Sequence, residues 1–256
     1  MLILLPPSEG KTAPRRGKPL DLATLTAPAL NPMRERVLAA LVTLCSGDPA
    51  TAAAVLEVPR SQLHLVSLNA AVRTAPTARA DEVYAGVLYD ALGLATLSSA
   101  ARRRATARVR IMSSLFGALA PNDRIPAYRL SGDAALPGLG TVAGVWRDSL
   151  GPVLTELVGD GLLVDLRSGM YAAFWRPTGL PRVATVRVLH EVGGKRQVVS
   201  HFNKATKGRI VRALLEDGAN PRTPARLAEV LRDLGWTVEE TPAKGTVQLD
   251  VVATDL

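Results

Sequence analysis

The sequence predicts an α/β fold with a mixed sheet, in one compact domain that spans residues 1–256. Three short and mainly apolar runs, 1–5, 109–112 and 162–166, are each typical of a buried strand, and small polar or charged residues follow each run, in the first case after Pro6-Pro7. Stretches with helical spacing separate these runs, and two strand pairs follow near the C-terminus. Strands that alternate with helices favour parallel pairing, whereas hairpins add antiparallel strands, so we expect a mixed sheet covered by helices.

After its opening strand, the first half of the chain is predicted to be mainly helical. Residues 13–31 are rich in Pro, Gly and basic residues, which is typical of a surface loop. Asp81 is a candidate N-cap for a helical segment that carries Tyr84, Leu88 and Leu92. Apolar spacing predicts the other helices over 32–44, over 49–72 with an interruption at Pro59, and over 96–104.

The second half of the chain is predicted to contain more strands. A hairpin is expected around Gly193-Gly194, with strands over 184–192 and 197–202. A last pair of strands is expected over 237–239 and 246–252. Helical spacing predicts three helices, over 145–157, 207–215 and 223–234.

Composition bounds the class of protein. The formal net charge is +8 and the sequence pI is about 10.1, which favours an anionic partner such as nucleic acid, a nucleotide or an acidic metabolite. The single cysteine, Cys45, allows no internal disulfide, which is typical of a reducing cytoplasm. The apolar N-terminal run is five residues long and no run reaches the ~18 residues of a membrane span. We therefore expect a cytoplasmic protein with no membrane partner.

Several familiar site chemistries are not favoured. Gly10-Lys11-Thr12 resembles the end of a phosphate-binding P-loop, but Leu5 stands where that loop needs its first glycine. The three histidines are scattered and the lone cysteine has no partner at ligand spacing, so we expect no metal site. No nucleophile-elbow motif and no cofactor motif is present. The sequence therefore predicts neither a metal nor a cofactor.

The remaining pattern consists of basic, hydroxyl and aromatic residues placed after predicted strands or in loops. The chain has 25 Arg and only 6 Lys, which draws attention to Lys11 after the first strand and to Lys204 and Lys207 after the hairpin. If the strands lie side by side, their ends would gather these groups at one positively charged cleft that binds an anion. The candidate binding residues are Ser8, Lys11, Arg124, Tyr128, Arg129, Arg147, Ser168, Tyr171, Lys204, Lys207 and Arg209.

Seven sequence blocks in order resemble the YaaA family of bacterial peroxide stress proteins over essentially the whole chain. The blocks are residues 8–12 (SEGKT), 84–87 (YAGV), 110–121 (RIMSSLFGALAP), 126–130 (PAYRL), 146–148 (WRD), 165–171 (DLRSGMY) and 200–208 (SHFNKATKG). The resemblance implies a cytoplasmic protein of compact α/β fold with a positively charged cleft. It also implies binding to double-stranded or branched DNA and a role in limiting iron-driven oxidative damage.

The resemblance further implies a helix-hairpin-helix element, which we place at residues 52–72. Pro59-Arg60-Ser61 stands there in place of the glycine pair of a typical hairpin loop, so the element is degenerate in this chain.

Two functions of different classes remain. The first is a DNA-binding stress protein whose lysines and arginines neutralise phosphates without reading sequence. The second is an enzyme that acts on an anionic small molecule or nucleotide, with Lys11 or Lys204 as nucleophile or acid–base group at a lowered pKa. We expect a binding protein rather than an enzyme, because the sequence shows no general base, metal site or cofactor motif.

Overall fold

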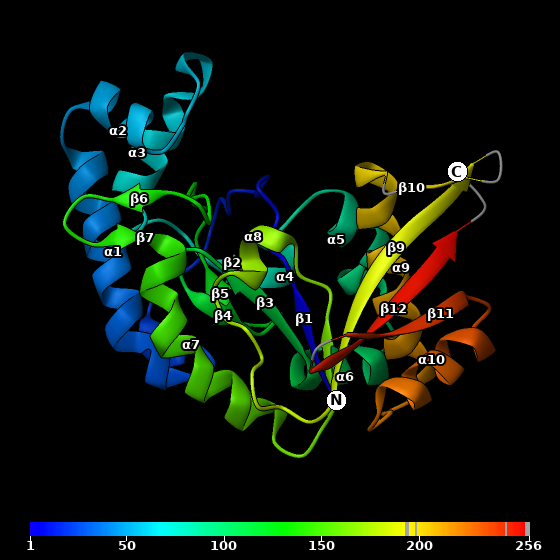
Figure 1. Ribbon diagram of the computed structural model, residues 1–256. Helices are drawn as coiled ribbons and strands as arrows, with labels where there is room; N and C mark the ends of the chain where they lie inside the picture. Colours follow the sequence, from blue (N-terminus) through cyan, green and yellow to red (C-terminus); the bar gives the residue numbers. More distant parts are fainter. Residues whose placement is uncertain (193–194, 198, 244, 254–256) are drawn as a thin grey trace.

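A computed structural model describes residues 1–192, 195–197, 199–243 and 245–253 (Figure 1). Its centre is an eight-stranded mixed sheet, which confirms the predicted fold class. The strands of this sheet are β1 (Leu2–Leu5), β3 (Val109–Ser113), β4 (Gly117–Leu119), β8 (Leu163–Asp165), β9 (Val183–Val192), β10 (Lys195–Gln197), β11 (Thr237–Ala243) and β12 (Thr246–Ala253). Two small ribbons pair β2 (Ala78–Arg79) with β5 (Arg124–Ile125) and β6 (Ala135–Leu136) with β7 (Gly140–Thr141).

The helices flank this sheet. They are α1 (Asn31–Ser46), α2 (Pro49–Val55), α3 (His64–Ala70), α4 (Ala80–Val83), α5 (Val87–Leu92), α6 (Ser99–Arg108), α7 (Val142–Val158), α8 (Gly169–Ala172), α9 (Ser200–Asp217) and α10 (Pro224–Asp233). Short 3-10 turns lie at Leu22–Thr24, Pro28–Leu30, Arg60–Gln62 and Leu94–Thr96. Helices α6, α9 and α10 contact β3, β9 and β12, while α1 and α7 lie together at the β4 end of the sheet (Figure 1).

The order of the strands is β11-β12-β9-β8-β1-β3-β4, with β10 paired to β9. Strands β3, β1, β8, β9 and β12 run parallel, and β4, β10 and β11 add antiparallel pairs. The chain moves from β1 to β3 on one side and later from β8 to β9 and β12 on the other. The order therefore reverses between β1 and β8, and such a switch point is where open α/β sheets bind ligands, beyond the carboxyl ends of the strands.

The central strands are apolar because helices or loops cover both of their faces. Ile3, Leu4 and Leu5 of β1 and Val164 of β8 are fully buried. Strands buried on both faces have continuous apolar runs rather than alternation, which is why the sequence indicated them clearly.

Gly117, at the start of β4, lies against the ring of Trp146. Its φ is +76°, and a Cβ there would lie 2.7 Å from Trp146 Cζ3. The indole cannot retreat easily, because its Nε1 donates to the Ser114 carbonyl at 2.7 Å and the side chain is fully buried. Gly117→Ala should therefore lower the free energy of unfolding by about 1–3 kcal/mol, measured by denaturant unfolding.

Gly138→Ala is the matched control for that substitution. Gly138 has a similar φ of +72° but open space around the position of a Cβ, so only backbone strain should remain. An equal loss of stability in the two variants would contradict the proposed contact with Trp146.

Three sequence predictions about elements were wrong in part. Asp81 lies inside the first turn of α4 rather than capping a longer helix, because the chain turns at Gly86, whose φ is +104°, and α5 begins only at Val87. The second hairpin strand ends at Gln197, and residues from Ser200 onward form α9. Helix α7 begins at Val142 with Thr141 as its N-cap, so Trp146 and Arg147 lie in its second turn.

The predicted hairpin turn, Gly193-Gly194, lies outside the described residues. Residues 49–72 form α2, a 3-10 turn and α3, as the predicted interruption at Pro59 indicated. Within the described part of the chain, no helix is both long and apolar enough to cross a bilayer.

Candidate functional site

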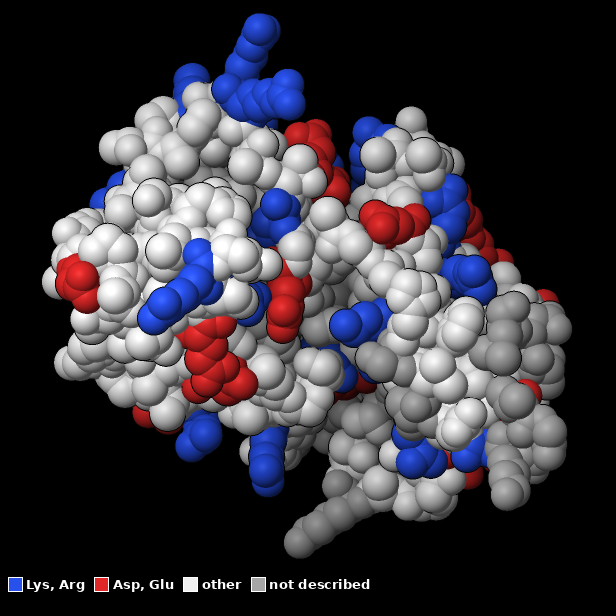
Figure 2. Space-filling model, turned by 90° about the horizontal axis from the view of Figure 1, so that it is seen from above, with Lys and Arg blue, Asp and Glu red and all other residues white. Residues whose placement is uncertain are grey.

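The candidate site lies at the carboxyl ends of β1, β3 and β8. Strand β1 runs into Pro6-Pro7 and the loop 8–11, β3 ends at Ser113-Ser114, and β8 is followed by residues 166–171. These are three of the segments whose polar residues the sequence analysis singled out. Figure 2 views this edge of the sheet from above, and the face is hollowed near its middle.

Backbone contacts fix the loop that carries Lys11. Lys11 forms a β-bridge with Tyr84, and the next amide, of Thr12, donates to the Val83 carbonyl at 2.8 Å. The Ser8 hydroxyl donates to the Gly10 carbonyl at 2.6 Å and accepts from the Ala85 amide at 3.1 Å. The loop after β1 is therefore tied to the segment between α4 and α5.

All four tyrosines of the chain are buried at this edge. The Tyr84 and Tyr128 hydroxyls lie 2.9 Å apart, and the Tyr128 hydroxyl lies 2.8 Å from Ser113 Oγ. Tyr89 stacks on Tyr84 with 5.5 Å between ring centroids and donates to the Pro6 carbonyl at 2.7 Å. Tyr171, in α8, packs against Phe174. Burial raises the pKa of each phenol, so all four side chains are neutral at pH 7.

The Lys11 ammonium lies over two of these rings. Its Nζ is 4.3 Å from the ring centroid of Tyr128 and 5.4 Å from that of Tyr84, and it donates to the Ser8 carbonyl at 2.8 Å. Burial, and then the neighbouring Arg129 guanidinium, lower the pKa of Lys11 to about 7, while the Glu9 carboxylate acts in the opposite direction. Contact with a ring face favours the charged form, whereas burial of the charge favours the neutral form.

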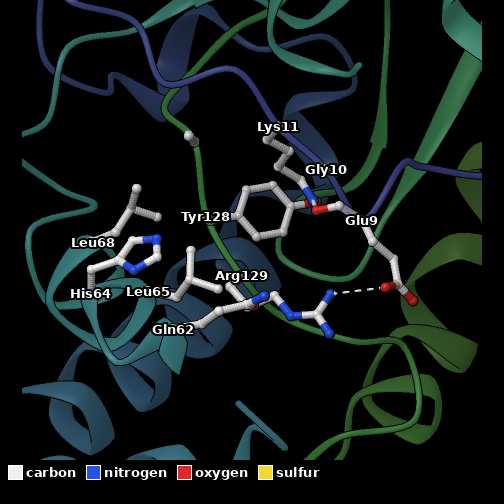
Figure 3. Close-up of a pocket in the computed structure, with 10 residues that line it drawn as sticks. Glu9, Gly10, Lys11, Gln62, His64, Leu65, Leu68, Tyr128 and Arg129 are labelled. Atoms are coloured by element: carbon white, nitrogen blue, oxygen red, sulfur yellow. Dashed lines mark hydrogen bonds and ion pairs between the residues drawn. The ribbon is translucent and has the colours of Figure 1, made fainter. Parts of the chain in front are cut away.

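Lys11 borders a cavity of about 410 Å³ (Figure 3). Arg129 lies on its rim, where a guanidinium Nη1 is 3.4 Å from a Glu9 carboxylate oxygen. The buried side chain of Asn69 holds the backbone of Arg129 at both its amide and its carbonyl, at 2.8 and 2.7 Å. The cavity is lined by Glu9, Gly10, Lys11, Gln62, His64, Leu65, Leu68, Ala127, Tyr128 and Arg129.

The structure therefore brings Ser8, Lys11, Tyr128 and Arg129 together. Lys207 lies at the neighbouring strand end, where its half-buried ammonium donates to the Leu166 carbonyl at 3.0 Å. Burial lowers the pKa of Lys207, against the opposing effect of Asp165.

The other predicted site residues lie outside this cavity. Lys204 and Arg209 are exposed on α9, inside the helix rather than before it, and Ser168 is exposed just before α8. Arg147 is exposed on α7 and lines a different depression, together with Trp175 and Arg176. Arg124 is exposed on β5 and donates to the Thr77 carbonyl at 2.8 Å. That these side chains bind an anion or DNA stays a prediction.

The sequence analysis did not identify several residues that surround Lys11, hold Arg129 or line the cavity. Tyr84 and Tyr89 flank the chain turn at Gly86, and their scarcity, as two of only four tyrosines, was a signal that could have been used. Asn69, Gln62 and His64 come from the α3 region, and no local pattern connects that region to the end of β1. Among the described residues, no group of three or more His, Cys, Asp or Glu side chains is placed to hold a metal ion.

The fold and the site define an α/β protein with a polar cavity beyond the parallel strand ends, beside the topological switch point. The chain belongs to the YaaA family: residues 1–241 match the family described as peroxide stress protein YaaA. The resemblance stated from the sequence is thereby confirmed, and the family description gives the protein a general stress-related role.

Relatives of similar length support this assignment. A UPF0246 protein of Streptomyces coelicolor is 53% identical over 248 residues, which cover 96% of this chain and 95% of the relative. A UPF0246 protein of Corynebacterium efficiens is 40% identical over 242 residues, covering 93% and 95%, respectively. A UPF0246 protein of Corynebacterium glutamicum is 38% identical over 246 residues, covering 94% and 96%.

Proposed function

We propose that this protein acts in the cytoplasm during peroxide stress by binding double-stranded or branched DNA through the cationic side chains around the carboxyl edge of its sheet. The supporting observation is the distribution of charge on that face. Lys and Arg side chains stand on both sides of the hollow in Figure 2, and Asp and Glu side chains lie among them. The exposed candidates are Lys204 on α9 and Arg147 on α7, with Arg129 on the cavity rim.

Such contacts would neutralise phosphates without reading base sequence. Each neutralised phosphate releases condensed counterions, so affinity falls as salt rises. Ferrous ions are among the cations that phosphates attract, so displacement of counterions would also lower the amount of iron held along bound DNA. We propose this as the route by which the protein limits iron-driven damage.

A salt titration tests the proposed DNA contacts. In the double variant Lys204→Ala/Arg147→Ala, the slope of log K against log salt on a fixed duplex should become shallower by about 1.8, since each lost phosphate contact removes about 0.9. Fluorescence anisotropy between 50 and 300 mM salt would measure that slope.

The matched control is Arg103→Ala/Arg226→Ala. It removes two exposed guanidinium groups from α6 and α10, away from the carboxyl edge (Figure 1). An equal change of slope in both double variants, or none in the first, would contradict DNA binding through this face.

A second candidate function has its own supporting observation. Lys11 lies beside a cavity with its pKa lowered to about 7, which is the condition under which a lysine serves as a nucleophile or an acid–base group. This function is an enzyme that acts on an anionic small molecule or nucleotide. Lys11→Arg separates the two functions, because it keeps the positive charge for phosphate contacts but removes the amine chemistry.

A further inference from the structure

The surroundings of Lys11 Nζ combine three features. Its hydrogen-bond acceptors are backbone carbonyls, of Ser8 at 2.8 Å and Glu9 at 3.5 Å. Its other near neighbours are the faces of Tyr84 and Tyr128, and a cavity of about 410 Å³ opens beside it. Carbonyls and rings accept no proton from the amine, so loss of the ammonium proton leaves a free lone pair next to open space.

The second group at the cavity is Arg129, which has an easily displaced partner. The Glu9 side chain is 79% exposed and meets Arg129 through a single contact of 3.4 Å, whereas the Arg129 side chain is 21% exposed and its backbone is held by Asn69. The oxygens of a phosphate can accept two hydrogen bonds from one guanidinium group, whereas Glu9 offers Arg129 a single carboxylate oxygen at 3.4 Å. A phosphate should therefore bind Arg129 more strongly than Glu9 does. A phosphorylated ligand can therefore take the place of Glu9.

We propose that Lys11 forms an imine with an aldehyde that carries a phosphate, with the phosphate held by Arg129. The proposal deepens the second candidate function above and rests on it. Two sources offer this chemistry: a free sugar phosphate, and the open-chain deoxyribose at an abasic site in DNA. The second source would join the cavity to the face that is proposed above to bind DNA.

The bond changes balance without an added oxidant or reductant. The Nζ lone pair attacks the carbonyl carbon while the C=O π electrons move to oxygen, and a proton passes from nitrogen to that oxygen to give a carbinolamine. Loss of the hydroxyl group with a further proton releases one water and leaves a C=N bond to Nζ. Amine and aldehyde are thus converted to imine and water.

The reaction needs the unprotonated amine. An ordinary lysine, with a pKa of ~10.4, is unprotonated in roughly one molecule in a thousand at pH 7.4. With its pKa lowered to about 7, Lys11 is unprotonated in more than half of the molecules at that pH. The rate of imine formation should therefore rise with pH and level off above a midpoint near 7.

Reduction with sodium borohydride tests the proposal, because it converts an imine to a stable secondary amine. The protein would be treated separately with glyceraldehyde 3-phosphate, with a duplex carrying one abasic site, and with the same duplex intact. Peptide mass mapping would then locate any adduct among the six lysines. We expect an adduct at Lys11 with at least one of the two aldehydes and none with the intact duplex.

The identity of the reactive aldehyde distinguishes the two sources. Lys11→Arg should abolish the adduct, whereas Lys18→Arg, which changes an exposed lysine of the same N-terminal segment, should retain it. No adduct at Lys11 with either aldehyde, or labelling of Lys18 to the same extent, would overturn the proposal. Affinity for the intact duplex, measured on the same preparations, reports on DNA binding separately, so failure of one function is not confused with failure of the other.

Two substitutions at the rim keep the test valid if Lys11→Arg fails to fold. Arg129→Gln should move the pH midpoint upward and lower the preference for glyceraldehyde 3-phosphate over glyceraldehyde by about tenfold or more. Glu9→Gln should move the midpoint downward, because it removes the charge that favours the ammonium form. Midpoints and preference unchanged by both substitutions would overturn the proposed role of Arg129.

Discussion

Replacing Asp165 by Asn is expected to lower the free energy of unfolding by about 3–5 kcal/mol. Asp165 ends β8 and receives two hydrogen bonds from the Arg167 guanidinium, at 2.9 and 2.7 Å, and one from the Arg167 amide at 3.0 Å. The Arg167 side chain is 1% exposed, so an amide at position 165 leaves its charge buried without a counter-ion. The measurement is urea unfolding of the variant and the wild-type protein.

Asp165→Asn should also disturb the candidate site, because Arg167 contacts residues in the segment that follows β8. Its Nη1 donates to the Tyr171 carbonyl at 3.2 Å, and its guanidinium lies 5.7 Å from the ring centroid of Trp175. The Asp165 carboxylate also opposes the fall in the pKa of Lys207, so Asp165→Asn should lower that pKa further.

A double variant separates the ion pair from general damage to β8. Asp165→Asn/Arg167→Met removes both charges and should be more stable than Asp165→Asn alone, since no unpaired charge remains buried. Asp160→Asn, at an exposed carboxylate, is the control and should change stability by no more than about 0.5 kcal/mol. A cost below about 1 kcal/mol for Asp165→Asn would contradict this account of the pair.

Arg34→Met is expected to lower the free energy of unfolding by at least about 3 kcal/mol, because it leaves buried carbonyl groups without donors. Arg34 of α1 is fully buried and its guanidinium joins two distant segments. It donates to the carbonyls of Phe116 and Ala118 at 3.0 and 2.9 Å, and to the carbonyl of Thr26 at 2.8 Å. Burial lowers the pKa of Arg34 to about 10, although Asp123 favours the charged form.

These contacts depend on the several N–H donors of the Arg34 guanidinium and not on its charge alone. Arg34→Lys should therefore recover only a minor part of the stability, since one ammonium cannot reach both segments. Arg36→Met, at an exposed position of the same helix, should change stability by no more than about 0.5 kcal/mol. Chemical unfolding of the three variants provides the comparison, and full rescue by lysine would contradict the proposed geometry.

The elements predicted best were those whose own residues show a recognisable pattern of apolar side chains. Strands β1, β3 and β8 were found because strands buried on both faces have continuous apolar runs, and the polar residues after them do lie at one edge. The start of α9 was missed because its N-cap, Val199, makes no side-chain capping hydrogen bond and gives no sequence signal.

The site was predicted in part, for a similar reason. Lys11, Tyr128 and Arg129 lie at one cavity as the sequence analysis expected, because they follow or neighbour central strand ends. Arg147 and Arg124 do not line this cavity, since the direction of a side chain on a helix or an edge ribbon depends on packing that the sequence does not display. The contribution of Asn69 depends on a tertiary contact 60 residues away along the chain.

The central claim is that the Lys11 amine beside the cavity has a pKa lowered to about 7. Protein labelled with ¹³C-lysine can be titrated from pH 5 to 11 by NMR, following the carbon next to Nζ, with Lys11→Arg used to assign the signal. The account predicts a midpoint near 7 for Lys11. A midpoint near the ordinary lysine value of ~10.4 would contradict it.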